Sequence, residues 1–144
     1  MTDPHSKPYL EPTQDAGRRF VSRGLQGPVV MLNLVRFRAV ADYSAAPSLA
    51  PPAPISGAEA FARYIAHTLP FVEQAGGVLL FLGSGGDYLI GPPHEHWDLV
   101  MLVRHQSPDR FLSFASNEGY LRGIGHRSAA LADSRLLPVV ERAP

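Results

Sequence analysis

Two segments that are apolar at nearly every position constrain the fold of this chain most. They are Val29–Phe37 (VVMLNLVRF) and Trp97–Arg104 (WDLVMLVR). A strand with one solvent-facing side alternates apolar and polar residues, whereas these two are apolar on both sides. The longest uninterrupted apolar runs are five residues, Val78–Leu82 and Leu99–Val103, far short of the roughly 20 that a membrane-spanning helix needs. The sequence therefore predicts two strands at the centre of a sheet whose faces are both covered.

The remaining elements follow from turn residues, capping residues and apolar spacing. Two more strands are expected, Val78–Leu82 and Ser134–Glu141, the former interrupted by a bulge at Gly83–Gly86 and resuming at Asp87–Ile90. The predicted helices are Thr13–Arg23, the segment from Ser56 to Gly76, the segment that begins at Ser107–Pro108, and a short one over His126–Ala132. Pro70 lies inside the second of these helices and is expected to kink it or break it near Thr68.

After the helix at 13–23, the order of these elements is β-α-β-β-α-β. That order is the split βαβ, or ferredoxin-like, arrangement of the α+β class, in which the first and third strands lie at the centre of an antiparallel sheet. Helices cover one face of such a sheet. Because both central strands are apolar on both faces, we expect a second copy of the chain to cover the other face, as a homodimer.

The organisation along the chain is that of one ordinary domain, since 144 residues fall within the roughly 100–200 typical of a domain. We assign residues 1–26 to an N-terminal arm with a short helix and residues 27–144 to the ferredoxin-like domain. Residues 39–55 carry four prolines among alanines and serines, and this density of proline predicts a long loop.

Composition excludes several classes of partner and site. Thirteen basic residues balance thirteen acidic ones, which argues against nucleic acid or an anionic membrane surface as a partner. The absence of cysteine excludes disulfides, thiol nucleophiles and sites with Cys ligands. The N-terminal residues lack the apolar stretch of a signal peptide, so we expect a cytoplasmic protein.

Several motifs, in the expected order, resemble one bacterial family. They are GPVVMLNLVRFR, the helix end FVEQAGG, WDLVMLVRHQSPDRFLSF, and EGYLRGIGHRSAALADSRLLP. The set resembles the thirteen-thirty domain-of-unknown-function group of the dimeric α/β-barrel superfamily, over residues 27–140. The resemblance implies a homodimer whose sheets face each other, with a pocket in each subunit between helices and sheet. It implies no single activity, because the superfamily fold supports several kinds of chemistry.

The last motif contains the first candidate site, His126, Arg127 and Asp133. A histidine can act as a general base near neutral pH, and a carboxylate can orient it. Residues seven apart return to one helix face, so His126 and Asp133 would face one another if the helix ran that far. Arg127 would hold a substrate carboxylate or an oxyanion. The alternative is structural: Asp133 caps or pairs at the helix end, and Arg127 binds a backbone carbonyl or a partner subunit.

The central strands supply a second candidate group, Asn33, Arg36 and Arg104. Asn33 interrupts an apolar strand, so a ligand, a water or a neighbouring side chain must satisfy its amide. Strand alternation puts Asn33 on the face opposite Arg36. Arg36 and Arg104 either line the mouth of a cavity as an anion site or form salt bridges at the dimer interface, with acids such as Glu73 or Asp98.

Tyr64 and His67 lie three residues apart on the long helix and so on neighbouring positions of one face. If that face lines the pocket, His67 is a second candidate base or a haem ligand; otherwise it is a hydrogen-bonded residue at the edge of the core. The run His94-Glu95-His96 is short of the ligands that a metal site needs and lies in a proline-flanked turn. We therefore expect neither a metal nor a cofactor.

The sequence thus favours a homodimer that binds a small molecule. If it is an enzyme, we expect cofactor-free proton transfer of an isomerase, cyclase or oxygenase-like kind on an apolar or aromatic acid, with His126 as base. The alternative is a non-catalytic binding or structural dimer. A cavity of a few hundred cubic ångströms, on which a histidine and an arginine converge, would favour the enzyme.

Overall fold

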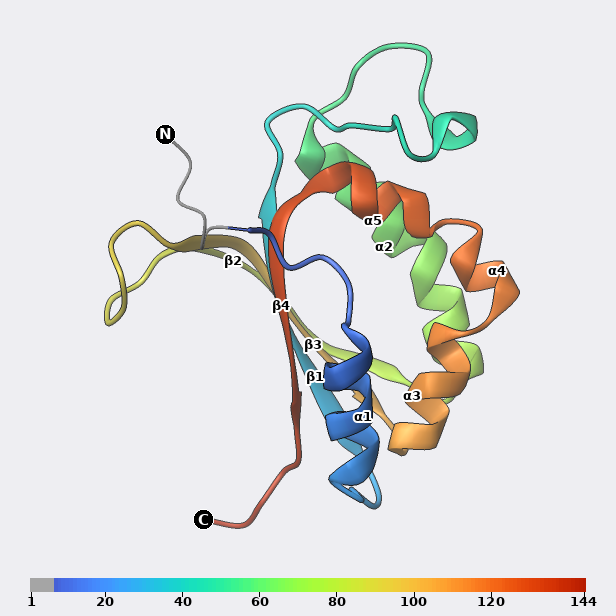
Figure 1. The fold of residues 1–144 in the computed structure, drawn as a ribbon, viewed down its shortest axis with the longest axis vertical. Coiled ribbons are helices and arrows are strands. Elements are labelled where there is room, and N and C mark those ends of the chain that lie inside the picture. The colour runs from blue at the N-terminus through green and yellow to red at the C-terminus, as the bar shows by residue number, and fades with distance from the viewer. Residues whose placement is uncertain (1–6) are drawn as a thin grey trace.

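A four-stranded antiparallel sheet with helices packed on one face forms the body of the chain (Figure 1). The computed structural model describes residues 7–144. The strands are β1 (Val29–Phe37), β2 (Val78–Asp87), β3 (His96–His105) and β4 (Leu131–Val139). Their order in the sheet is β2-β3-β1-β4, so the two most apolar strands are central. This confirms the predicted ferredoxin-like α+β fold.

Five α-helices and one 3₁₀ turn complete the part of the chain that the structure describes. Four of the α-helices described begin at residues whose side chains accept hydrogen bonds from the exposed N–H groups of the first turn: the predicted caps Thr13, Ser56 and Ser107, and Asn117. The elements are α1 (Gln14–Ser22), η1 (Pro47–Leu49), α2 (Gly57–Gln74), α3 (Pro108–Ala115), α4 (Glu118–Leu121) and α5 (Ile124–Ala130).

Several elements differ in extent or continuity from the sequence-based predictions, three of them by more than a residue or two of fraying. Helix α2 continues through Pro70 to Gln74 without a break, and Pro70 is exposed. Strand β2 is continuous to Asp87, and its register shift falls between Leu79 and Phe81 instead of in the glycine run. Helix α5 ends at Ala130 and β4 begins at Leu131, because the pairing of Leu131 with Phe37 continues the sheet.

The two faces of the sheet have different surroundings. On the face that carries the helices, Val29, Met31 and Val35 of β1 are buried, and the core lies between them and α2 to α5. The strand register places a second set of apolar residues on the opposite face, which we call the outer face. It consists of Val30, Leu32, Leu34, Phe81, Val100, Leu102, Leu137 and Val139.

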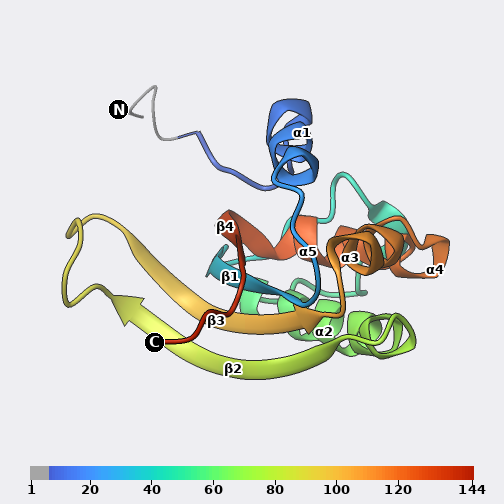
Figure 2. The ribbon, with the colours of Figure 1, turned by 90° about the horizontal axis from the view of Figure 1, so that it is seen from below.

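The hairpin that joins β2 and β3 projects from the sheet on the side away from the helices (Figures 1 and 2). At its tip, Leu89 is 101% and Ile90 93% exposed. The outer face and this apolar tip therefore lie on one side of the molecule.

The segment before α1 runs beside the edge strand β4. The Tyr9 N–H donates to Asp133 Oδ1 at 2.8 Å, and Ser134 Oγ donates to the Tyr9 carbonyl. Helix α1 then packs through Phe20 against Phe111 of α3, with ring centroids 6.0 Å apart. Residues 1–6 of the predicted arm lie outside the described residues, and the division of the chain at residue 26 stays a prediction.

The proline-rich segment 39–55 is a loop, as predicted, apart from the short turn η1. It is attached to the body of the protein: the Asp42 N–H donates to the Ala129 carbonyl at 2.9 Å, and Tyr43 is buried. None of the helices described is long and apolar enough to cross a membrane.

Candidate functional site

A cavity of about 290 Å³ lies between the inner face of the sheet and the helices. Its wall is mostly apolar and draws on α2, α3, α4, α5, all four strands and the segment before α1. The residues that line it are Leu10, Glu11, Pro12, Met31, Asn33, Phe61, Tyr64, Ile65, Thr68, Leu69, Val72, Leu79, Met101, Val103, His105, Phe111, Phe114, Ala115, Tyr120, Ile124, Arg127, Ser128 and Leu136.

His105 is a polar residue of this wall that the sequence analysis missed. It is the last residue of β3 and only 2% exposed, and its ring packs against Phe111 and Phe114 at centroid distances of 5.1 and 5.4 Å. Its Nδ1 has no hydrogen-bond partner among the described residues. Burial lowers the pKa of His105 to about 4, so the ring is neutral at pH 7. The signal for it was the alternation of β3, which puts residue 105 on the same face as Met101 and Val103.

Thr68 supplies a second polar atom of the same kind. It lies on α2, is 7% exposed, and its Oγ1 also has no partner within residues 7–144. A helical threonine commonly returns its hydroxyl to a carbonyl one turn back; Thr68 does not. Helix α2 ends at Gln74, and Val78, four residues later, pairs with Arg104 at the end of β3. Thr68, six residues before the end of α2, therefore lies toward the His105 end of the sheet.

Arg127 lies in the cavity wall at the other end of the sheet from His105. It contacts Ser134, which pairs with Val35, whereas His105 pairs with Val29. One guanidinium nitrogen donates to the Leu10 carbonyl at 2.6 Å and the other to Ser134 Oγ at 3.3 Å. Guanidinium has five N–H donors, and Arg127 forms no salt bridge with a carboxylate among the described residues. The bond to a backbone carbonyl agrees with the structural alternative for Arg127. Its role in holding a carboxylate or an oxyanion stays a prediction, and its place in the cavity wall is compatible with that role.

Two more predicted residues line the cavity, Asn33 and Tyr64. Asn33 lies on the face opposite Arg36, as strand alternation predicted. Its amide donates to the Met31 carbonyl at 3.1 Å, so a backbone oxygen takes the place of the predicted side chain, water or ligand. The Tyr64 hydroxyl is 2.7 Å from that of Tyr120, and these two buried groups satisfy each other.

The predicted pairing of His126 with Asp133 is wrong, because α5 ends before it reaches residue 133. His126 lies outside the cavity lining, where its Nδ1 is hydrogen-bonded to the Tyr43 hydroxyl at 2.7 Å. Burial, together with the charges of Arg63 and His67, lowers the pKa of His126. A role for His126 as a base stays a prediction, now with Tyr43 as its partner.

Asp133 is a buried carboxylate at the start of β4. Burial alone would raise the pKa of Asp133. The hydrogen bonds from the Tyr9 and Ser134 N–H groups and the hydrogen bond and charge of Arg135 lower this pKa by more than burial raises it, so the net shift is downward. Arg135 donates to Asp133 Oδ1 at 2.8 Å. These contacts tie the segment before α1 to the sheet, which agrees with the structural alternative for Asp133.

Arg36 and Arg104 do not share a site. Arg36 lies 3.6 Å from Asp133 Oδ2 and not beside the expected Glu73 or Asp98; Asp98 instead accepts from the Phe37 N–H. Arg104 pairs with Val30 in the sheet. Val30 and Arg36 are six residues apart on β1, which corresponds to about 20 Å at the rise of a strand. Both side chains lie on the outer-face side and outside the cavity lining.

His67 is also outside the cavity lining. Its Nε2 donates to the carbonyls of Gly119 and Tyr120 at 2.9 and 3.2 Å, and its ring packs on Phe71. His67 thus holds α4 against α2, which is the second of the two alternatives predicted for it. Within the described residues, no group of three or more His, Asp or Glu side chains is arranged to hold a metal ion.

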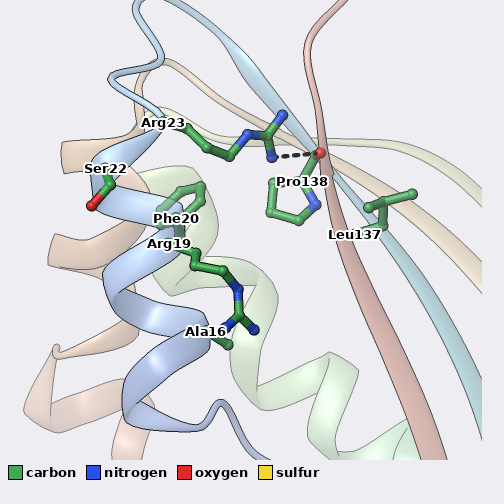
Figure 3. A pocket seen from close by; sticks show the side chains of 7 residues that line it. All are labelled: Ala16, Arg19, Phe20, Ser22, Arg23, Leu137 and Pro138. Atoms are coloured by element: carbon green, nitrogen blue, oxygen red, sulfur yellow. Dashed lines mark hydrogen bonds between the residues drawn. The ribbon is translucent and has the colours of Figure 1, made fainter.

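A second hollow is an open groove between α1 and the end of β4 (Figure 3). Arg23 crosses it to donate to the Pro138 carbonyl at 3.3 Å. The groove holds arginines and apolar side chains, but neither of the buried unpartnered polar atoms of residues 7–144 lies in it. The cavity between sheet and helices is therefore the better candidate site.

Comparison with solved structures finds two close matches. Both are crystal structures of the RPA0582 protein, one of its methylated form and the other described as a protein of unknown function from Rhodopseudomonas palustris. Each is 34% identical to this chain. The alignment with the first structure covers 95% of this chain and 97% of the solved chain, with a TM-score of 0.84. The alignment with the second covers 96% of this chain and 100% of the solved chain, with a TM-score of 0.82.

A third solved structure is more distant. It is a dimeric ferredoxin-like protein of unknown function from Thermobifida fusca YX, 12% identical to this chain. The alignment covers 81% of this chain and 92% of the solved chain, with a TM-score of 0.47. No family model and no curated protein matches the chain.

Proposed function

We propose that this chain, which belongs to the family of the Rhodopseudomonas palustris RPA0582 protein, is a homodimer that binds a small apolar or aromatic acid in its cavity. The observation that carries this proposal is the cavity itself, an apolar space of about 290 Å³ with an arginine in its wall that forms no salt bridge with a described carboxylate. Glu11, the one acidic residue of the described lining, is exposed. Its volume is close to the lower end of the roughly 300–1,000 Å³ of ligand pockets.

Arg127 is the residue that would hold the carboxylate of the ligand. A carboxylate placed in an apolar cavity is costly without a countercharge, and a guanidinium offers paired donors of matching geometry. Two contacts to Leu10 and Ser134 fix the position of Arg127, so its remaining N–H groups are held ready for a ligand oxygen.

The homodimer is supported by the outer face. Eight apolar side chains from all four strands lie there, and Phe81 and Leu137 are more than half exposed. The hairpin carrying Leu89 and Ile90 projects on the same side (Figure 2). An apolar surface of this kind is typical of an interface, and a second copy would cover it through the same residues. We also propose the finer placement in the thirteen-thirty group, on the motifs quoted above.

Binding is favoured over proton transfer as the function of this site. The predicted base, His126, is bonded to Tyr43 and is not part of the cavity wall. The histidine in the wall, His105, is a weak base because its pKa is lowered to about 4, and general bases work best near the operating pH. Cofactor-free proton transfer at His126 stays a second proposal, with the Tyr43 hydrogen bond as its support.

The experiment that tests the binding proposal is a titration with 3-phenylpropanoate, followed by thermal unfolding and calorimetry. We expect saturable stabilisation of the wild type, since a ligand that binds only the folded state raises its stability. Ala115→Phe, which fills part of the cavity, should abolish it; the matched control Ala16→Phe, in the α1–β4 groove, should not. Loss of binding in Ala16→Phe alone, or no saturable binding, would contradict the proposal.

A further inference from the structure

The cavity wall contains two buried hydrogen-bonding atoms that nothing described so far employs, His105 Nδ1 and Thr68 Oγ1. Each belongs to a side chain that is more than nine-tenths buried, and each side chain lines the cavity. A buried polar atom without a partner costs about 1–3 kcal/mol, so two at one end of one cavity form a marked departure from the pattern of a folded core. A group that enters the cavity and hydrogen-bonds to them would remove that cost.

The surroundings of these two atoms define what such a group can be. The His105 ring packs against Phe111 and Phe114. Among the described residues that line the cavity, Arg127 is the only arginine or lysine and Glu11 the only acidic residue, and Glu11 follows Leu10, whose carbonyl Arg127 binds. An anion at this end would be buried without a countercharge, and a cation without a carboxylate beside it. The group is therefore uncharged.

A hydroxyl fits these two atoms better than other uncharged groups. A neutral imidazole Nδ1 is a donor in one tautomer and an acceptor in the other, and the threonine hydroxyl can be either. An alcohol or phenol both donates and accepts, so one hydroxyl can bond to Thr68 and His105 together in either tautomer. A ketone or ether only accepts and leaves one of the two atoms unpaired in the acceptor tautomer.

The position of this end relative to Arg127 defines the rest of the ligand. His105 pairs with Val29 at the start of β1, whereas Ser134, which Arg127 contacts, pairs with Val35. Six residues of strand span about 20 Å, part of which the Arg127 and His105 side chains occupy. Between the two ends, the wall has apolar and aromatic side chains such as Phe61 and Met101, together with Asn33, whose amide is bonded to the Met31 carbonyl.

We propose that Thr68 and His105 form a hydroxyl-binding subsite, and that the ligand is an apolar or aromatic acid with a hydroxyl group at the end remote from its carboxylate. This inference rests on the proposed function, because it takes the Arg127 end as the carboxylate site. It adds the second polar group of the ligand and places it at the end of the cavity remote from the first.

The test compares acids that differ by one hydroxyl. The probes are 3-phenylpropanoate and 3-(4-hydroxyphenyl)propanoate, and the matching butanoates, so that one chain length does not decide the result. We expect the hydroxyl to tighten binding about tenfold to the wild type, as one to two net hydrogen bonds would. Thr68→Val keeps the shape of the side chain and His105→Phe keeps an aromatic ring. In each variant we expect the ratio between the affinities of the two acids to fall to twofold or less. The acid without a hydroxyl is measured in the same variant as the reference, so a change in the binding of both acids does not affect this ratio.

The outcomes separate the two proposals. If no acid of either kind binds, the proposed function fails. If the acids bind but the hydroxyl adds nothing at either length, or its gain survives in both variants, the hydroxyl subsite is wrong and the acid site stands. If a variant does not fold, a measurement on the wild type replaces it. The imidazole ¹⁵N signals of His105 should shift when the acids with a hydroxyl bind and should not shift when the acids without one bind. An unchanged His105 signal on saturation would overturn the subsite.

Discussion

Thr68 and His105 show, at the scale of single residues, a conflict between stability and binding. Each leaves a buried polar atom without a partner in residues 7–144, although neighbouring buried groups such as the Tyr64 and Tyr120 hydroxyls satisfy each other. Residues that bind ligands are commonly not optimal for stability. The free protein should therefore become more stable when either polar atom is removed.

Thr68→Val is the cleanest test of that expectation, because valine has nearly the same shape. Removing an unpartnered buried hydroxyl should raise the free energy of unfolding by about 1 kcal/mol, measured by urea denaturation without ligand. A variant that is less stable than the wild type by 1 kcal/mol or more would mean that the hydroxyl has a partner inside the fold.

The pH dependence of stability tests the burial of His105. Because its pKa is lowered from 6.5 to about 4 in the folded state, the unfolded chain binds a proton that the folded chain does not between those values. The stability that His105 contributes is therefore complete above pH 6.5 and is lost as the pH falls toward 4, by about 3 kcal/mol at most.

Wild type and His105→Phe should thus be compared by denaturation at several pH values from 7 to 4. The difference in unfolding free energy between them should change over this range, in favour of the variant at low pH, while the other histidines contribute equally to both. Parallel curves would show that His105 titrates normally and is not buried.

At the residue scale, the sequence predicted part of the site. Asn33, Tyr64 and Arg127 line the cavity, whereas His67 and His126 are bonded elsewhere. His67 and His126 were predicted as site residues because of the chemistry of the imidazole ring. The position of each ring in the fold depends on contacts between distant segments, such as that of Tyr43 with His126. His105 could have been found by extending the alternation of β3 by one residue, since that alternation needs no long-range contact.

At the scale of elements, the strands were easier to predict than the connections between them. The apolar pattern identified β1 and β3 and their central places. The boundary between α5 and β4 was wrong, because Ala129, Ala130 and Leu131 are good helix formers and only the pairing of Leu131 with Phe37 makes β4 begin there. Such tertiary contacts override local propensity.

The close approach of α2 to its neighbours gives a prediction at this scale. A Cβ on Gly57, the first residue of α2, would lie 2.2 Å from the Arg38 carbonyl oxygen and 2.7 Å from that of Ala130. Gly57→Ala should therefore destabilise the protein by about 3 kcal/mol, since backbone atoms would have to move. The control is Gly17→Ala in α1, which has nothing within 4 Å and should stabilise by about 0.5–1 kcal/mol. Equal effects of the two substitutions in thermal or urea unfolding would contradict this account of α2.

At the scale of the whole molecule, the proposed dimer is tested by charging the outer face. We expect light scattering of the wild type at micromolar concentration to give twice the 15.6 kDa mass of one chain. Leu32→Arg places a charge at the centre of this face and should give a monomer with an unchanged circular dichroism spectrum, because Leu32 is not on the helix-covered face. A monomeric wild type, or a dimeric Leu32→Arg, would exclude this surface as the interface.

The central claim is that the space between sheet and helices is a ligand site with a carboxylate end and a hydroxyl end. A crystal structure of the protein with 3-(4-hydroxyphenyl)propanoate tests it most directly. We predict one molecule in each cavity, with its carboxylate at Arg127 and its hydroxyl within hydrogen-bond distance of Thr68 Oγ1 and His105 Nδ1. Density for the acid in the groove between α1 and β4, or in the cavity with its two ends reversed, would contradict the account.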